Sequence, residues 1–254
     1  MKIVLSLLIT TILGCASMHA QEVLYTRDRN LPCIERKFYV YVHIILDSLR
    51  QPGISDVKIK AHLAEANKAF EPLCISFDYC KTDTVRDYSF NEINEKDEIE
   101  LLFTRFQKKR RINIYYSDFV ISEQTNSFSF FNGISSIDSA AIFLPKSGVG
   151  LVHELGHTFG LHHIFEKKFG FEKVDGTDCA TTGDMICDTP AAIDVFHDKK
   201  TCEYYGNTID VNGDYYKMEL GNFMSHYFCA HCFFTTEQYE KMASNFLNAP
   251  IKLW

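Results

Sequence analysis

Hydrophobic and polar positions along the chain predict a mixture of strands and helices, beginning with a strand over residues 37–47. That segment, KFYVYVHIILD, is rich in β-branched and aromatic residues, which favour a central strand. Apolar positions near helical spacing over residues 56–70, with Ser55 or Asp56 as cap, predict a helix. Shorter apolar runs predict three more strands, at residues 74–79, 111–116 and 139–144.

The second half of the chain has a weaker pattern. Residues 165–222 are rich in Gly, Asp and Cys, which indicates a loop-dominated region. Residues 235–247 predict a final helix, with Thr235 or Thr236 as cap. The acidic segment 91–110 fits either a helix or a solvated loop, and residues 127–134 read as a loop that turns at Gly133.

Length and composition limit the classes of protein to consider. A chain of 254 residues with 46% hydrophobic residues can form one compact unit or two small lobes. The formal net charge of −7 argues against nucleic acid, or an anionic membrane surface, as a partner. It gives no indication of the oligomeric state.

The N-terminus has the pattern of an export signal. Lys2 precedes an apolar stretch, residues 3–14, that is too short to span a bilayer. Two processing outcomes stay open: a lipobox ending at Cys15, with a leader of residues 1–14 and a lipid anchor, or cleavage near Ala20. Either predicts an exported protein, whether secreted, periplasmic or an outer-membrane lipoprotein, with residues 21–34 as a short lead-in.

Eight cysteines remain after Cys15, and an even number in an exported protein predicts up to four disulfides. Cys229 and Cys232 lie beside two histidines, so a structural zinc site there is an alternative to disulfides. Cys33 could cap a metal as a thiolate, although a disulfide is the preferred interpretation.

The segment 153–163, HELGHTFGLHH, carries the strongest chemical signal. His153 and His157 are four residues apart, so on a helix they project from one face and can share a Zn²⁺. Gly160 can adopt a positive φ that ends the helix and lets His163 approach the same ion. Three histidines leave a fourth position open for water, as in catalytic zinc sites. Glu154 is placed to act as general base on that water.

These residues resemble the metzincin zinc proteases, and within them the pappalysin family, including its bacterial members such as ulilysin. The resemblance covers roughly residues 35–247. Beyond the zinc motif it rests on residues 183–190, GDMICDTP, on Asn222-Phe223-Met224, and on the start of the last helix around Gln238.

The resemblance implies further site residues. Met224 would lie beneath the zinc histidines as a hydrophobic base. Family members carry structural calcium, for which Asp184, Asp188 and Thr189 are the candidate oxygen ligands. A tyrosine that stabilises the transition state commonly stands two residues after the methionine; here His226 holds that offset and Tyr227 follows it, so either, or neither, takes that role.

The sequence therefore predicts a metzincin-like α+β fold over residues 35–254. An upper lobe, about residues 35–163, would hold a twisted mixed sheet and two helices; a smaller, irregular, disulfide-rich lower lobe, about 164–254, would end in a helix. A peptide substrate would pair with an edge strand near residues 139–144. The expected function is that of an exported zinc endopeptidase acting on proteins or peptides. The alternatives are a catalytically silent zinc-binding protein or adhesin, and another zinc hydrolase such as an amidase or carboxypeptidase.

Overall fold

The computed structural model describes residues 31–93, 96–120, 128–131, 140–147, 150–194, 206–225 and 232–249. The export signal, the lead-in up to residue 30 and the lipidation candidate Cys15 lie outside them, so those predictions stay untested. Within the described residues, no helix is long and apolar enough to cross a membrane.

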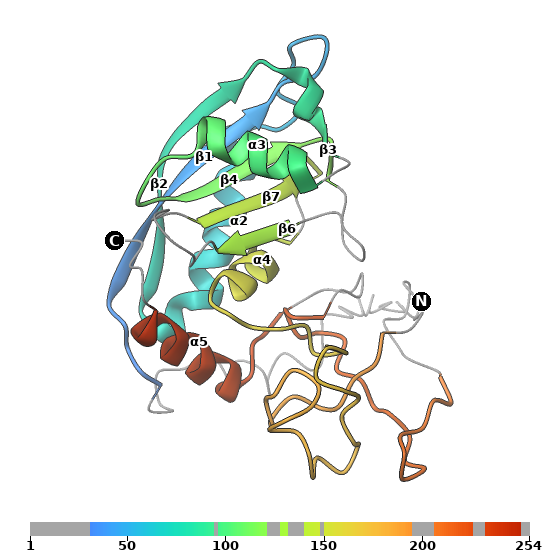
Figure 1. The fold of residues 1–254 in the computed structure, drawn as a ribbon. Coiled ribbons are helices and arrows are strands. Elements are labelled where there is room, and N and C mark those ends of the chain that lie inside the picture. The colour runs from blue at the N-terminus through green and yellow to red at the C-terminus, as the bar shows by residue number, and fades with distance from the viewer. Residues whose placement is uncertain are drawn as a thin grey trace, which may run out of the picture.

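A five-stranded mixed sheet forms the upper part of the molecule (Figure 1). Its strand order is β2-β1-β4-β7-β6, and β6 alone runs antiparallel to its neighbour. The strands are β1 (Arg36–Ile45), β2 (Ile75–Val85), β4 (Ile112–Ser117), β6 (Phe128–Phe131) and β7 (Ala140–Pro145). Strands β3 (Glu92–Ile93) and β5 (Phe119–Val120) pair separately.

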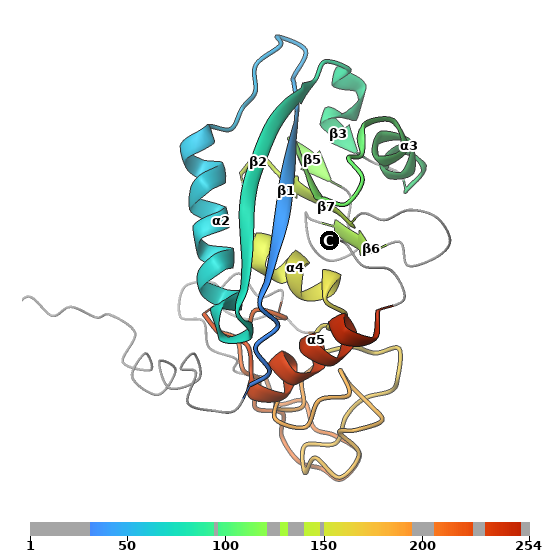
Figure 2. The same ribbon diagram turned by 90° about the vertical axis from the view of Figure 1, so that its left-hand side faces the viewer.

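Helices cover both faces of this sheet. Figure 2 shows α2 (Asp56–Phe70) on one side and α3 (Lys96–Phe106) on the other. Helix α4 (Leu151–Thr158) contacts α2 and shares its apolar core. The α2 and α4 side holds the larger apolar core, which continues downward to α5 (Thr236–Asn248). A smaller core lies under α3. Short 3₁₀ turns at Glu71–Leu73 and Tyr88–Asn91 complete the elements.

Most predicted elements are confirmed. Ser55 caps α2 by accepting from Lys58 N, and Thr235 caps α5 in a capping box with Gln238. The loop-dominated region is also confirmed where the structure describes it, at residues 159–194 and 206–225; we call these two segments the loop region. The boundary between two lobes near residue 163 stays a prediction.

Two expectations were wrong. Residues 128–131 form strand β6 instead of a loop. The strand at 140–145 therefore lies between β4 and β6, so the edge on this side of the sheet is β6 and a substrate cannot pair with β7. Of the two alternatives for the acidic segment, a helix or a solvated loop, the structure has the helix, α3, which joins α2 and α4 in the upper part. Its acidic first turn, Asp97 and Glu98, suits the positive end of the helix dipole.

Two disulfides lie within the described residues, Cys33–Cys74 and Cys179–Cys187. The first ties the segment before β1 to the start of β2, which excludes Cys33 as a thiolate cap on a metal. Cys80 is exposed and in no disulfide, so the chain does not reach the maximum of four disulfides that eight cysteines would allow. Cys202 and Cys229 lie outside the described residues.

Candidate metal centre

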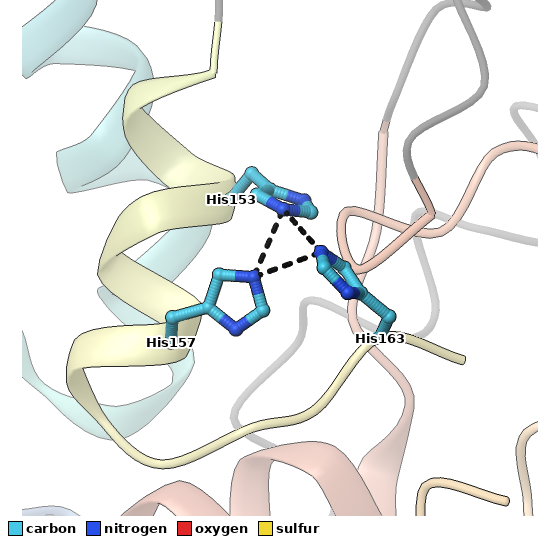
Figure 3. Close-up of side chains that lie close together, drawn as sticks. All are labelled: His153, His157 and His163. Atoms are coloured by element: carbon cyan, nitrogen blue, oxygen red, sulfur yellow. Dashed lines mark hydrogen bonds between the residues drawn. The ribbon is translucent and has the colours of Figure 1, made fainter. Parts of the chain in front are cut away.

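The three predicted histidines converge at the end of helix α4. His153 and His157 lie one helical turn apart, and the helix ends at Thr158. Gly160 has a φ of +86°, which the sequence predicted, and its N–H bonds to the carbonyl of His157 at 2.8 Å. The chain then reverses and brings His163 back to the helix (Figure 3).

The three Nε2 atoms form a nearly equilateral triangle. The distances are 3.0 Å between His153 and His157, 3.1 Å between His157 and His163, and 3.2 Å between His153 and His163. Three nitrogens that bind a zinc ion at about 2.0 Å in a tetrahedral arrangement lie about 3.3 Å from one another. Within the described residues, this triad is the group of metal-ligating side chains whose ligand atoms all lie within 4.8 Å of one another.

Backbone carbonyls fix which ring nitrogen faces the centre. His153 Nδ1 lies 2.7 Å from the carbonyl oxygen of Phe223, and His157 Nδ1 lies 2.9 Å from that of Leu161. A carbonyl only accepts, so both Nδ1 atoms carry hydrogen, and the Nε2 lone pairs of the neutral rings point inward. Lone pairs at about 3 Å repel one another unless a cation lies between them, so the site fits a metal ion.

Glu154 lies beside His153 in α4 and is 2% exposed. Its backbone carbonyl accepts a hydrogen bond from Thr158 Oγ1 at 2.9 Å. A buried carboxylate next to a candidate metal ligand fits a proton-transfer group.

The Asn222-Phe223-Met224 segment lies directly against the histidines. Met224 is fully buried, and a Cβ placed on Gly156 of α4 would overlap its sulfur. The carbonyl of Met224 accepts from the N–H of Ile164, the residue after His163. The methionine thus packs under the helix that carries His153 and His157, as the resemblance implied.

The calcium candidates do not all face one point. Asp184 is buried, and its carboxylate accepts from Thr189 Oγ1 at 3.0 Å and from Ile186 N at 3.1 Å. Asp188 instead accepts from the backbone N–H of Glu237 at the start of α5. Burial raises the pKa of Asp184 to about 8.

A third buried carboxyl, Glu172, was not predicted from the sequence. It is 3% exposed, and its Oε2 has no hydrogen-bond partner among the described residues. Burial first, and the charge of Asp178 second, raise its pKa to about 7. No local signal distinguishes this glutamate from the exposed acidic residues around it. Calcium binding in this region stays a prediction.

Two further predicted residues, His226 and Tyr227, lie outside the described residues, as does the group formed by Cys229 and His231. His162, next to His163 in the chain, does not join the triad. Its Nδ1 lies 3.8 Å from Glu166, and its ring packs edge-on against Phe169.

A short helix presenting two histidines, a glycine turn returning a third, and a methionine packed beneath them define a metzincin-type metal centre on an α+β fold. The sequence profile of the pregnancy-associated plasma protein-A peptidases matches residues 110–248, more than half of the chain. The chain belongs to this family, the pappalysins.

The chain is also similar to individual proteins that are named as metalloproteases. An extracellular metalloprotease of Colletotrichum graminicola is 27% identical over 170 residues, which are 59% of this chain and 56% of that protein. The extracellular metalloprotease NCU07200 of Neurospora crassa is 25% identical over 173 residues, 60% and 55% of the two chains. This chain thus spans a little over half the length of these relatives. The crystal structure of metalloproteinase-II from Bacteroides fragilis aligns with 61% of this chain and 49% of its own, at 14% identity and a TM-score of 0.35.

Proposed function

We propose that this protein is an exported zinc-dependent endopeptidase, with His153, His157 and His163 as zinc ligands. The observation that carries the proposal is the convergence of three Nε2 atoms within 3.2 Å, two of them oriented by backbone carbonyls. Family membership supports peptidase chemistry, and the relatives named extracellular support export.

The mechanism divides between the ion and the protein. His153, His157 and His163 would hold the zinc ion, which would supply a Lewis acid that activates water and polarises the peptide carbonyl. Glu154 accepts the proton of the attacking water on its carboxylate and delivers it to the nitrogen of the leaving amine. Phe223 and Leu161 hold their histidines through carbonyl contacts, which keeps both Nε2 lone pairs available.

The burial of Glu154 favours an enzyme over a silent binding protein. Placing a carboxylate at 2% exposure costs solvation energy, and three histidines bind zinc without it. We also propose, as a separate hypothesis, that the loop region binds calcium through Asp184 and Thr189, with Glu172 as an additional ligand. The orphaned Oε2 of Glu172 supports this extension.

The test is cleavage of a peptide library by the purified protein and by its Glu154→Gln variant, with products sequenced by mass spectrometry. We expect internal cuts, reduced by about 10²-fold or more in Glu154→Gln while bound zinc is unchanged. Glu166→Gln is the matched control, because it removes a carboxylate just beyond His163. This variant is expected to cleave peptides as the unmutated protein does.

Other results would change the assignment. Removal of single terminal residues would indicate a carboxypeptidase, and hydrolysis of non-peptide amides alone an amidase. Silence from the unmutated protein with zinc bound would favour a binding role.

A further inference from the structure

Helix α5 contacts the chain segments that hold the zinc histidines at two separate places. We propose that Gln238 and Asn245 of this helix are positioning residues that orient His153 and His157, respectively. The proposal rests on the zinc site described above and adds to it a means by which the last helix sets the geometry of the site.

The first contact starts at the N-terminus of α5. Gln238 forms the capping box with Thr235: its Oε1 accepts from Thr235 N at 2.9 Å, and its N–H donates to Thr235 Oγ1 at 3.2 Å. The same side-chain amide pairs with that of Asn222 in both directions, at 2.8 and 3.1 Å. Gln238 is 0% and Asn222 1% exposed, so these bonds are shielded from water.

Asn222 passes this constraint to His153. Its Oδ1 accepts from Met224 N at 2.8 Å, while Phe223 N bonds to the carbonyl of Phe233 at 2.8 Å. The peptide between Phe223 and Met224 is therefore held at its own N–H, and the peptide before it is held at the N–H of Phe223. Its carbonyl is the one that accepts from His153 Nδ1 at 2.7 Å.

The second contact lies about two turns further along α5, on nearly the same face of the helix. Asn245 Nδ2 donates to the carbonyls of Phe159 at 3.0 Å and Gly160 at 3.3 Å. A Cβ at Gly160 would overlap this amide, so the turn and Asn245 are closely packed. The next carbonyl, of Leu161, accepts from His157 Nδ1 at 2.9 Å. In Figure 3 the faint red ribbon of α5 lies below the turn that leaves α4.

The residue types are specific for this role. An amide at position 238 both accepts from Thr235 N and donates to Asn222 Oδ1, whereas a glutamate could cap the helix but not donate. A glutamate satisfies the capping box equally well, so the cap alone does not require glutamine. Removing a partner that orients a metal-binding histidine typically lowers the affinity for the metal by about 10- to 100-fold.

The experiment compares two test variants with two controls from the same helix. Gln238→Met keeps the volume but removes the amide pair, and Asn245→Ala removes the bonds to the turn. Tyr239→Phe removes a buried hydrogen bond of 2.8 Å to the carbonyl of Ala69, away from the histidines. Asn248→Ala removes an exposed contact with Ser244.

Zinc affinity, measured by competition with a chromophoric chelator, is the first readout. We expect Kd to rise about 10- to 100-fold in Gln238→Met and Asn245→Ala and to stay within about twofold in the controls. Thermal unfolding of the metal-free proteins is measured beside it. If Gln238→Met and Tyr239→Phe lose similar stability and bind zinc equally well, Gln238 is merely structural and the proposal is wrong.

A second readout does not depend on zinc. Long-range ¹H–¹⁵N NMR of the metal-free protein, at about pH 8 where ordinary histidines are neutral, reports the tautomer of each ring. We expect His153 as the Nδ1–H tautomer in the unmutated protein and a mixture in Gln238→Met, with His157 changing only in Asn245→Ala. Unchanged tautomers would overturn the proposal. An unmutated protein with these tautomers but no zinc affinity would refute the proposed function and leave the positioning role standing.

Discussion

At the scale of single residues, Gly156 shows how closely helix α4 packs against its neighbours. It lies inside α4, where alanine is a better helix former by about 1 kcal/mol. A Cβ at this position would overlap Met224 Sδ and approach the ring of Phe234 at 3.4 Å. Packing against the methionine, and not helix propensity, therefore explains the glycine.

Gly156→Ala is accordingly expected to destabilise the protein by about 1–3 kcal/mol, because the overlap outweighs the gain in helix propensity. Urea unfolding of the metal-free protein measures the change. In a Met224→Ala background the same substitution should cost much less, since the clashing sulfur is gone. Equal costs in both backgrounds would contradict this explanation.

The sequence predicts the histidines of the site better than it predicts the groups that hold these histidines in place. The spacing of His153, His157, Gly160 and His163 was sufficient to predict the triad and its turn. The carbonyls of Phe223 and Leu161 carry no residue-specific signal, because any residue has one. Asn245 looks like any polar residue on an exposed helix face, and its role depends on tertiary packing.

At the scale of elements, patterns of apolar residues predicted most helices and strands. The unbroken run at residues 140–144 could have indicated an interior strand, since a strand buried on both faces shows no alternation. Strand β6 was missed because Gly133 favoured a loop, although residues 128–131, FSFF, partly alternate. Pairing between strands is a long-range property, so the edge position could not be read locally.

The disulfide Cys33–Cys74 is the covalent link between β1 and β2, and it encloses a sequence separation of 41 residues. Replacing both cysteines by serine is expected to lower the free energy of unfolding by about 2–4 kcal/mol, through the added freedom of the unfolded chain. Cys179–Cys187, with a separation of 8, should contribute less.

Urea unfolding of the two double variants measures this order. Zinc affinity serves as the control and should be unchanged in the Cys33/Cys74 variant, because this disulfide does not contact the triad. A larger loss from removing Cys179–Cys187 would show that chain entropy is not the main contribution.

At the scale of the whole molecule, the sheet and the loop region both contain buried ionisable groups. The contributions of these groups to stability depend on pH in opposite directions. His43 is 1% exposed in the sheet, with its ring stacked on Tyr115, and burial lowers its pKa to about 4. Glu172 and Asp184 lie in the loop region with pKa values raised to about 7 and about 8.

Stability should therefore change with pH in a defined way. A lowered histidine pKa stabilises the fold above about pH 6.5, and this contribution is lost as the pH falls towards 4. Raised carboxyl pKa values act in reverse: their contribution is present below about pH 4 and is lost as the pH rises to about 8. Of these three groups, only the two carboxyls act between pH 6.5 and 8, so their contribution to stability should fall there.

Thermal unfolding in a chelating buffer between about pH 6.5 and 8 tests this, with Asp184→Asn expected to flatten the fall. Asp214→Asn, in an exposed part of the loop region, is the matched control and should leave the slope unchanged. Calcium added in excess over the chelator should abolish the fall if the carboxylates bind it. No effect of calcium would refute the calcium hypothesis and leave the pH dependence intact.

The most direct test of the central claim is X-ray absorption at the zinc edge of the purified protein loaded with one equivalent of zinc. We predict three imidazole nitrogens and one light ligand at about 2.0 Å, and loss of bound zinc in His157→Ala but not in His162→Ala. Sulfur ligands at about 2.3 Å would place the metal on cysteines instead and contradict the histidine site.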